Sequence, residues 1–284
     1  MKSYIHILCA ALTAVLASCS NSDLPADGGA NLRQVTVSVA TDHAPATRAT
    51  DPTITRYAIS VWEDEACSTA AEVFTDGTNH ATNPTGSFAM ILNCTKSYYC
   101  LFWADNGTDY TLDDALKSIT LKDGSKASEA YCGKTTIPAS TSSTSYTADL
   151  KRAVAKITLK ETNEMPAGNT MTVTFDQYTV FDVQNGTAGT PAPCTVTWTT
   201  TAKTGTTDTP VQLNDEDIFA LAPIAGASLA NVTFQCNDEG GVMVPNVPFR
   251  ANYNTNIKGH YTTVSNQTFS VSVNDTWEAE EHAP

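Results

Sequence analysis

Short stretches in which apolar and polar residues alternate recur along most of the chain, and this pattern constrains the fold most strongly. Val35, Val37 and Val39 alternate with small or polar residues, and residues 150–159 repeat the alternation. A period of two is typical of a β-strand with one buried face. Turn residues separate these stretches at short intervals, as in β-sandwiches. No strand–helix–strand rhythm is visible, so we expect an all-β protein and not a parallel α/β sheet.

The composition supports this expectation, because Thr, Ser and Val dominate and long stretches of helix-forming residues are missing. Only segment 113–119 is expected to form one or two helical turns. Residues 137–148 are rich in Ser, Thr and Ala and nearly free of charge, and they predict a boundary between domains 20–148 and 149–284. The expected strands are 35–39, 56–62, 88–92, 98–104, 150–159, 170–175, 179–183, 195–199, 217–222, 230–236, 256–264 and 269–273.

The first nineteen residues have the layout of an export signal. Lys2 supplies a positive charge, and an apolar run of residues 4–15 follows it, ending in Leu16-Ala17-Ser18-Cys19. This run is too short to remain as a membrane-spanning helix. The tetrad resembles the bacterial lipoprotein signal, so we predict a signal peptide over residues 1–19 and lipidation of Cys19. The alternative is an ordinary signal peptide with a chance cysteine.

The charge of the chain argues against nucleic acid as a partner. The formal net charge is −14, and it becomes −15 after removal of the signal because Lys2 is the only charge lost. Such a surface repels phosphate backbones and anionic lipid headgroups. Acyl chains on Cys19 would therefore have to provide the attachment to a membrane.

Six cysteines remain in the exported chain, and their spacing defines no metal site. In an oxidising compartment they allow up to three disulfides. Buried free thiols are the alternative, because a reduced cysteine packs as a small apolar group. The six residues are Cys67, Cys94, Cys100, Cys132, Cys194 and Cys236.

No arrangement of residues points to catalysis, so the sequence predicts a protein that is not an enzyme and needs no cofactor or metal. None of the histidines lies in a nucleophile-elbow or zinc-protease motif. Residues 105–109 group several oxygen ligands and invite a calcium hypothesis, but an Asx turn explains them more simply. Tyr110 and Trp277 could stack on sugars, although such aromatics more often belong to a core or its rim.

Two strand-like segments with similar apolar residues lie near opposite ends of the chain. The first carries Val35, Val37 and Val39, and Arg48 follows it in a stretch that a trypsin-like protease could reach. The second segment carries Phe269, Val271 and Val273. Because both have the same period, one could in principle occupy the place left by the other.

Several motifs together resemble the fimbrillin-type lipoproteins, the type V pilin class of Bacteroidetes. The most specific are the strand at residues 150–157 and the later Asn-Ile-Lys-Gly strand. The motifs are Leu16-Ala17-Ser18-Cys19, Ala46-Thr47-Arg48-Ala49, Phe102-Trp103-Ala104-Asp105, residues 150–157, Asn246-Val247-Pro248 and residues 252–259.

This resemblance implies two transthyretin-like β-sandwich domains in tandem and a pilin exported as a lipoprotein to the outer membrane and cell surface. It also implies cleavage by an arginine-specific protease, for which Arg48 is the matching position. Cleavage would release the first strand, with Val35, Val37 and Val39. A donor strand with Phe269, Val271 and Val273 from another fimbrial subunit, identical or homologous, would then fill the groove. The alternative function is a non-polymerising surface lipoprotein that binds glycan or host protein.

Overall fold

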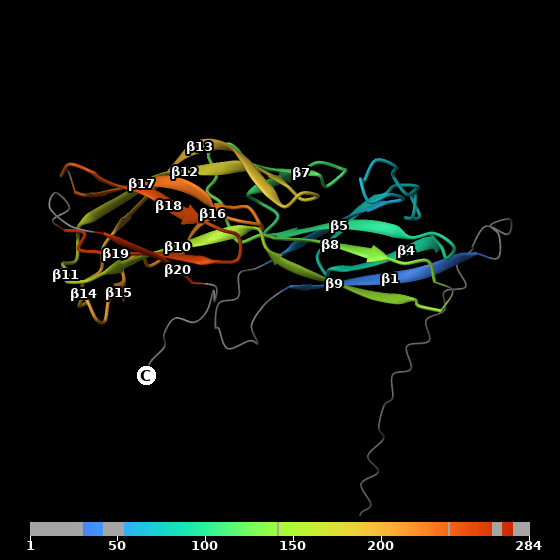
Figure 1. Ribbon diagram of the computed structural model, residues 1–284, viewed down its shortest axis with the longest axis horizontal. Coiled ribbons are helices and arrows are strands. Elements are labelled where there is room, and N and C mark those ends of the chain that lie inside the picture. The colour runs from blue at the N-terminus through green and yellow to red at the C-terminus, as the bar shows by residue number, and fades with distance from the viewer. Residues whose placement is uncertain (1–30, 42–53, 141, 238, 263–268, 275–284) are drawn as a thin grey trace, which may run out of the picture.

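The computed structural model describes residues 31–41, 54–140, 142–237, 239–262 and 269–274, and their regular secondary structure is entirely β (Figure 1). The predicted all-β class is therefore confirmed for these residues. None of them forms a helix long and apolar enough to cross a lipid bilayer. Two sheets account for most strands, and they lie side by side along the long axis of the molecule.

The first sheet has seven strands in the order β3-β2-β5-β8-β9-β1-β4. Every strand pairing in this sheet is antiparallel except the pairing of β1 with β9, which is parallel. The strands are β1 (Leu32–Thr41), β2 (Arg56–Trp62), β3 (His80–Asn83), β4 (Ser87–Asn93), β5 (Tyr98–Asp105), β8 (Tyr131–Ile137) and β9 (Ser145–Arg152).

The second sheet has eleven strands, with the path β18-β17-β12-β16-β10-β19-β20. Outside this path, β13 and β7 pair with β12, β15 pairs with β10, and β6 pairs with β7. The strands are β6 (Tyr110–Leu112), β7 (Ser118–Leu121), β10 (Val154–Glu161), β12 (Thr170–Asp182), β13 (Thr187–Thr199), β15 (Val211–Gln212), β16 (Ile218–Leu221), β17 (Ser228–Cys236), β18 (Val242–Phe249), β19 (Asn254–Gly259) and β20 (Ser270–Asn274). A separate pair joins β11 (Glu164–Met165) to β14 (Lys203–Thr204).

The first core lies inside the seven-stranded sheet, which folds over so that β9, β1 and β4 pack on β2, β5 and β8. Alternate residues of each strand supply the core, as the period of a strand requires. From one layer come the buried side chains of Val35, Val37, Phe88, Met90, Leu92, Ala148 and Leu150. From the other come Ile59, Val61, Tyr98, Cys100, Phe102, Ala104, Tyr131 and Ile137.

The opposite faces of β2, β5 and β8 are also buried, and they form a second core against the larger sheet. Trp103 on β5 lies at its centre, with its ring 5.5 Å from that of Tyr110 and 5.6 Å from that of Phe181. Strand β5 is thus apolar on both faces, and it connects the two halves of the molecule through side-chain packing.

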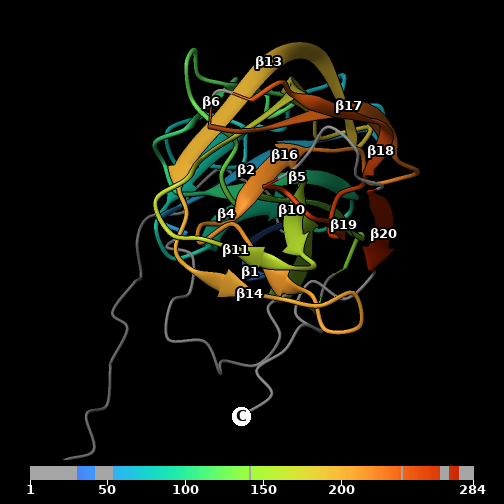
Figure 2. The same cartoon turned by 90° about the vertical axis from the view of Figure 1, so that its left-hand side faces the viewer.

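The third core lies between two layers of the larger sheet (Figure 2). Strands β12, β17 and β18 form one layer, while β10, β16 and β19 form the other. Phe234 of β17 meets Tyr261 edge-on, with 5.2 Å between the ring centroids.

The strand expected at 150–159 is two strands, and this prediction was wrong. β9 ends at Arg152 and β10 begins at Val154, so the chain passes from one sheet to the other at Ala153. The backbone amide of Ala153 binds the carbonyl of Ala130 in the first half, and its carbonyl accepts from Ala222 in the second. The predicted division at 148/149 falls within β9, and the two-domain arrangement itself stays a prediction.

The helical turns expected at 113–119 are also wrong, because residues 113–117 form the turn between β6 and β7 and residues 118–119 belong to β7. Leu116 has a φ of 51°, which an α-helix does not allow. The carboxylate of Asp113 accepts the amide of Ser118 at 3.1 Å and so closes the turn locally.

Replacing Trp103 by alanine should lower the free energy of unfolding by about 3–5 kcal/mol, because it empties the centre of the junction core. Urea unfolding of the purified chain measures the effect. Leu229→Ala is the control, since Leu229 is 64% exposed and its loss should cost less than about 0.5 kcal/mol. Equal effects of the two changes would contradict the central place of Trp103.

Candidate functional site

Strand β1 is the element most closely related to the predicted site, and it is an interior strand of its sheet. Its inward side chains Val35 and Val37 are 4% and 0% exposed, whereas Val39 is half-buried. Gln34 points outward and is exposed. The predicted inward face of this strand therefore forms part of the first core.

Two strands flank β1 and overlap only along its middle. β4 pairs with Leu32–Ser38 in antiparallel register, while β9 pairs with Thr36–Thr41 in parallel register. One backbone hydrogen bond continues the contacts of β1 at each end. The amide of Cys94 donates to the carbonyl of Asn31, and the amide of Val39 donates to the carbonyl of Gly86, each at 2.8 Å. Among the described strands, β4 pairs only with β1, so loss of β1 would leave β4 without a neighbour in the sheet.

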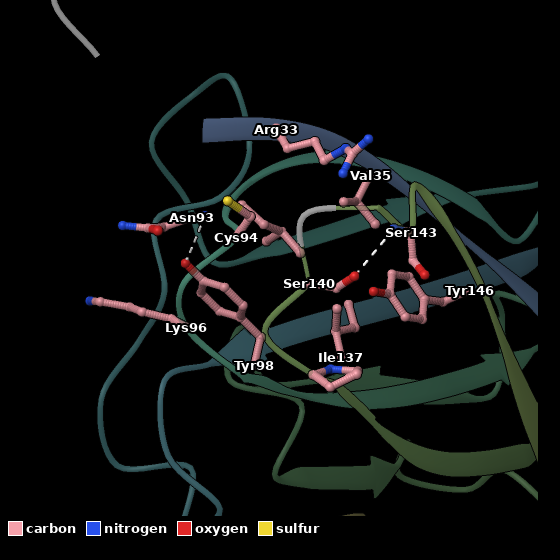
Figure 3. A pocket seen from close by; sticks show the side chains of 12 residues that line it. Arg33, Val35, Asn93, Cys94, Lys96, Tyr98, Ile137, Ser140, Ser143 and Tyr146 are labelled. Carbon is pink, nitrogen blue, oxygen red and sulfur yellow. Dashed lines mark hydrogen bonds between the residues drawn. The ribbon is translucent and has the colours of Figure 1, made fainter. Parts of the chain in front are cut away.

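A small pocket continues the seat of β1 beyond the end of its pairing with β9 (Figure 3). Arg33 and Val35 line it from β1, Tyr98 from β5 and Tyr146 from β9. The hydroxyl of Tyr98 accepts the amide of Asn93 at 3.0 Å, which fixes one wall. Among the described residues, no strand pairs with the first half of β1 on the side of β9, where Ser140 and Ser143 border the pocket.

Strand β20, which carries the second predicted segment, lies in the other sheet. It pairs antiparallel with β19 at the edge of that sheet. Phe269 stacks on Phe234 with 5.5 Å between ring centroids, and it lies so close to Gly259 that a Cβ there would overlap its ring. Val271 is half-buried and Val273 is 39% exposed. The predicted donor residues thus pack against β19 and the third core of their own chain, and not in the groove that β1 occupies.

Two predicted positions lie outside the described residues. These are Cys19, the predicted lipidation site, and Arg48, the predicted cleavage site. Arg48 belongs to residues 42–53, which connect β1 to β2. Lipidation and cleavage therefore remain predictions.

The six cysteines among the described residues are free thiols. Burial raises the pKa of Cys100 and of Cys132 to about 12, so both stay protonated at neutral pH. Only Cys94 is partly exposed, and it lines the pocket beside β1. The possibility of disulfides is therefore not realised, and the buried thiols pack as small apolar groups.

The oxygen-rich loop at residues 105–109, which invites a calcium hypothesis, stabilises the fold. Asp105 is fully buried and accepts two hydrogen bonds from Arg56, from Nε at 2.8 Å and from Nη2 at 2.6 Å. Asn106 accepts the amides of Thr108 and Asp109, which is an Asx turn. The described residues contain no cluster of three potential metal ligands. Tyr110 is fully buried, so it is a core residue and cannot stack on a sugar.

Sequence reasoning missed a chain of polar side chains after β19. The imidazole of His260 lies 2.9 Å from the carboxylate of Glu161 through Nδ1 and 2.7 Å from the hydroxyl of Thr262 through Nε2. Glu161 also accepts the amides of Thr162, Asn163 and Tyr261. The carboxylate therefore ties the end of β10 to the segment that precedes β20. Glu161 is separated by 99 residues from His260, and no local pattern marks the contact.

The sequence signal for β9 was present but weak. Tyr146, Ala148 and Leu150 alternate with exposed residues, and the last two are buried in the first core. Because small and hydroxyl-bearing residues surround Tyr146 and Ala148, the sequence indicates a boundary there, and only residues 150–152 of β9 fall within an expected strand.

These features define a class: an all-β protein of two packed sheets, with an N-terminal strand inserted between two others. The chain belongs to the family of unknown function DUF6562, whose sequence profile matches residues 28–283. No curated protein matches it in sequence.

Several crystal structures share the fold. A "putative cell adhesion protein" from Bacteroides ovatus is 14% identical, with 86% of this chain and 98% of that chain covered and a TM-score of 0.53. A second "putative cell adhesion protein", from Bacteroides uniformis, is 14% identical, with coverages of 85% and 98% and a TM-score of 0.50. A "putative adhesin" from Bacteroides ovatus is 11% identical, with coverages of 86% and 94% and a TM-score of 0.50. At these identities the likeness shows a common fold.

Replacing Val37 by alanine should destabilise the uncut chain by about 2 kcal/mol, because two buried carbon atoms are lost and a cavity remains. Urea unfolding again measures the change. Gln34→Ala, on the exposed side of the same strand, should change stability by less than about 0.5 kcal/mol. If both variants unfold like the wild type, β1 does not contribute to the core as described.

Proposed function

We propose that this protein is a structural subunit of a surface fimbria, exported as a lipoprotein and activated by cleavage after Arg48. The observation that carries the proposal is the position of β1, an interior strand whose chain connection to β2 includes Arg48. A strand that is held only by hydrogen bonds and side-chain packing after one cut can be exchanged for another.

The common fold with the "putative cell adhesion proteins" and the "putative adhesin" of Bacteroides supports a role at the cell surface. In the proposed sequence of events, Cys19 is lipidated and anchors the precursor to the outer membrane. An arginine-specific protease then cuts after Arg48. Removal of residues 20–48 changes the formal net charge only from −15 to −14, so the proposed switch depends on strand exchange and not on a change in charge.

Departure of β1 would expose the unpaired edges of β4 and β9 together with the apolar residues beneath them. Unpaired strand edges are templates for another strand. A neighbouring subunit that presents Phe269, Val271 and Val273 could add to these edges by β-augmentation. This step requires β20 to leave β19 first, because it pairs there within its own chain.

Lengths add a condition to this mechanism. β1 has 10 residues and β20 has 5, so β20 alone would fill only part of the groove. The donor segment would therefore include residues on either side of β20. The partners are other fimbrial subunits, either further copies of this chain or homologous chains.

Arg48→Ala should give a full-length, membrane-bound monomer that forms no fimbriae, because β1 cannot leave its groove. Immunoblotting and electron microscopy of cells carrying the variant measure this. Arg48→Lys is the matched variant: it should behave like the alanine variant if the protease is specific for arginine. Normal assembly of the Arg48→Ala protein would overturn the mechanism.

Labelled palmitate should mark the wild-type protein, while Cys19→Ser should lose both the label and its membrane association. Cys94→Ser is the control, because Cys94 is the partly exposed thiol of the folded part and should not affect labelling. Retention of the label by the Cys19→Ser protein would refute the lipid anchor.

A second candidate function is a non-polymerising surface lipoprotein that binds glycan or host protein. The observation in its favour is β20, which pairs with β19 of its own chain. Size-exclusion chromatography before and after limited trypsin separates the two candidates. Oligomers that appear only after cleavage support the pilin, and a monomer throughout that binds a glycan array supports the second candidate.

A further inference from the structure

The outward face of β10 and β19 carries an unusual set of side chains. Ala155, Ile157 and Leu159 point into the third core, so the alternate residues of β10 point the other way. In the parallel register these face the corresponding residues of β19, and the hydroxyl of Thr158 donates to the side chain of Asn254 at 2.8 Å. We define the lysine–asparagine face as Lys156, Thr158, Lys160, Asn254, Asn256 and Lys258.

This face is positively charged in a chain whose formal net charge is −14. Three of its six residues are lysines. The Nζ of Lys156 lies 2.7 Å from the carboxylate of Asp217, which neutralises one charge at one end of the face. None of the six residues is acidic, so the formal charge of the set is opposite in sign to that of the protein.

The face is also buried, although it lies on the outer side of a sandwich layer. Lys156 and Lys160 are each 5% exposed, and Asn256 is fully buried. The strands that pair with β10 are β19, β16 and β15, which lie beside it in the same sheet and not above it. Pairing within the sheet does not by itself bury outward side chains, whereas a segment lying across the face would.

Asn256 indicates the chemistry that such a segment brings. Its side-chain Nδ2 and Oδ1 form no hydrogen bond with the described residues. Leaving a buried polar group without a partner costs about 1–3 kcal/mol. A peptide backbone offers both a donor and an acceptor, and it can satisfy both atoms of an amide.

We propose that residues 275–284, which follow β20 directly, dock on the lysine–asparagine face. The segment carries Asp275, Glu278, Glu280 and Glu281, so its charge is complementary to the three lysines. Trp277 adds an aromatic ring, and half-buried Phe219, which pairs with Lys156 across β16 and β10, borders the face.

The docking is within reach of the chain. β20 pairs with β19, and β19 pairs with β10, so the segment starts two strands away, about 10 Å. Ten extended residues span roughly 33 Å. No hinge or rearrangement of the sheet is needed.

Docking would hold β20 against β19, because β20 would then be fixed at both ends. Phe269 packs on Phe234 before the strand, and the docked segment would follow it. This consequence rests on the proposed function, in which β20 must leave before it can act as a donor. The docking itself does not depend on cleavage or assembly. It would delay release of β20 in the monomer.

Zero-length carbodiimide coupling of the purified full-length chain tests the docking, because it joins a carboxylate to an amine only when the two are in contact. Mass spectrometry should find amide links from Glu278, Glu280 or Glu281 to Lys160 or Lys258. At about 1 M salt, where the Debye length falls to roughly 3 Å, these links should decrease several-fold. Exposed Lys126 is the control amine and should form few links to the segment.

Mixing unlabelled and ¹⁵N-labelled chains distinguishes the occupants. Links confined to one isotope show docking within a chain, whereas mixed pairs would identify a second copy and overturn the proposal. A chain that ends at Asn274 should show faster amide hydrogen exchange in β19 and β20. Links spread equally over Lys126 and the face, or unchanged exchange after truncation, would also overturn it. The uncut monomer is used throughout, so the result is independent of cleavage after Arg48.

Discussion

The structure depends on the backbone pairing and side-chain packing of β1 between β4 and β9. Val37 is fully buried and Val35 nearly so, and both fill the space between the two layers of the first core. Each buried valine contributes about 1.5 kcal/mol or more, and the paired backbone satisfies groups that would otherwise face the core edge without partners. β4 has no other strand beside it among the described residues. A single strand thus completes the sheet and holds its edge.

The second constraint is β5, which is buried on both faces. Its two sets of alternating side chains enter different cores, and Trp103 connects the first half to β6, β7 and β12. The chain itself crosses between the sheets at Ala153, next to this junction. Exchange of β1 would therefore alter one layer of the first core while the junction and the third core keep their packing. That separation makes a removable strand compatible with a stable subunit.

Sequence patterns predicted the strands that carry strong alternation or a long apolar run. The bounds expected for β2 agree with the structure, and β1 was found through its three valines. The sequence does not indicate the first part of β9, because Ala148 is its first buried residue and lies within a stretch of Ser and Thr. The split at Ala153 was missed because Leu150 and Ile157 enter different cores, which is a property of tertiary packing and not of local period.

The candidate site, like the fold, could be predicted only where local sequence patterns carry the signal. The inward face of β1 follows from period alone, but its partners β4 and β9 do not, because strand pairing between distant segments leaves no local signal. The seat of Phe269 over Gly259 and the contact between Glu161 and His260 are equally non-local. Cys19 and Arg48 rest on motifs, and they remain predictions.

Alkylation of Cys100 tests most directly whether β1 closes the first core. The thiol lies in that core with Val35 and Val37, and burial raises its pKa to about 12, so it should not react in the intact chain. After cleavage within residues 42–53 and separation of β1, Cys100 should be alkylated many-fold faster, while Cys236 in the third core stays protected. A Cys100 that remains protected after β1 has been removed would contradict the account.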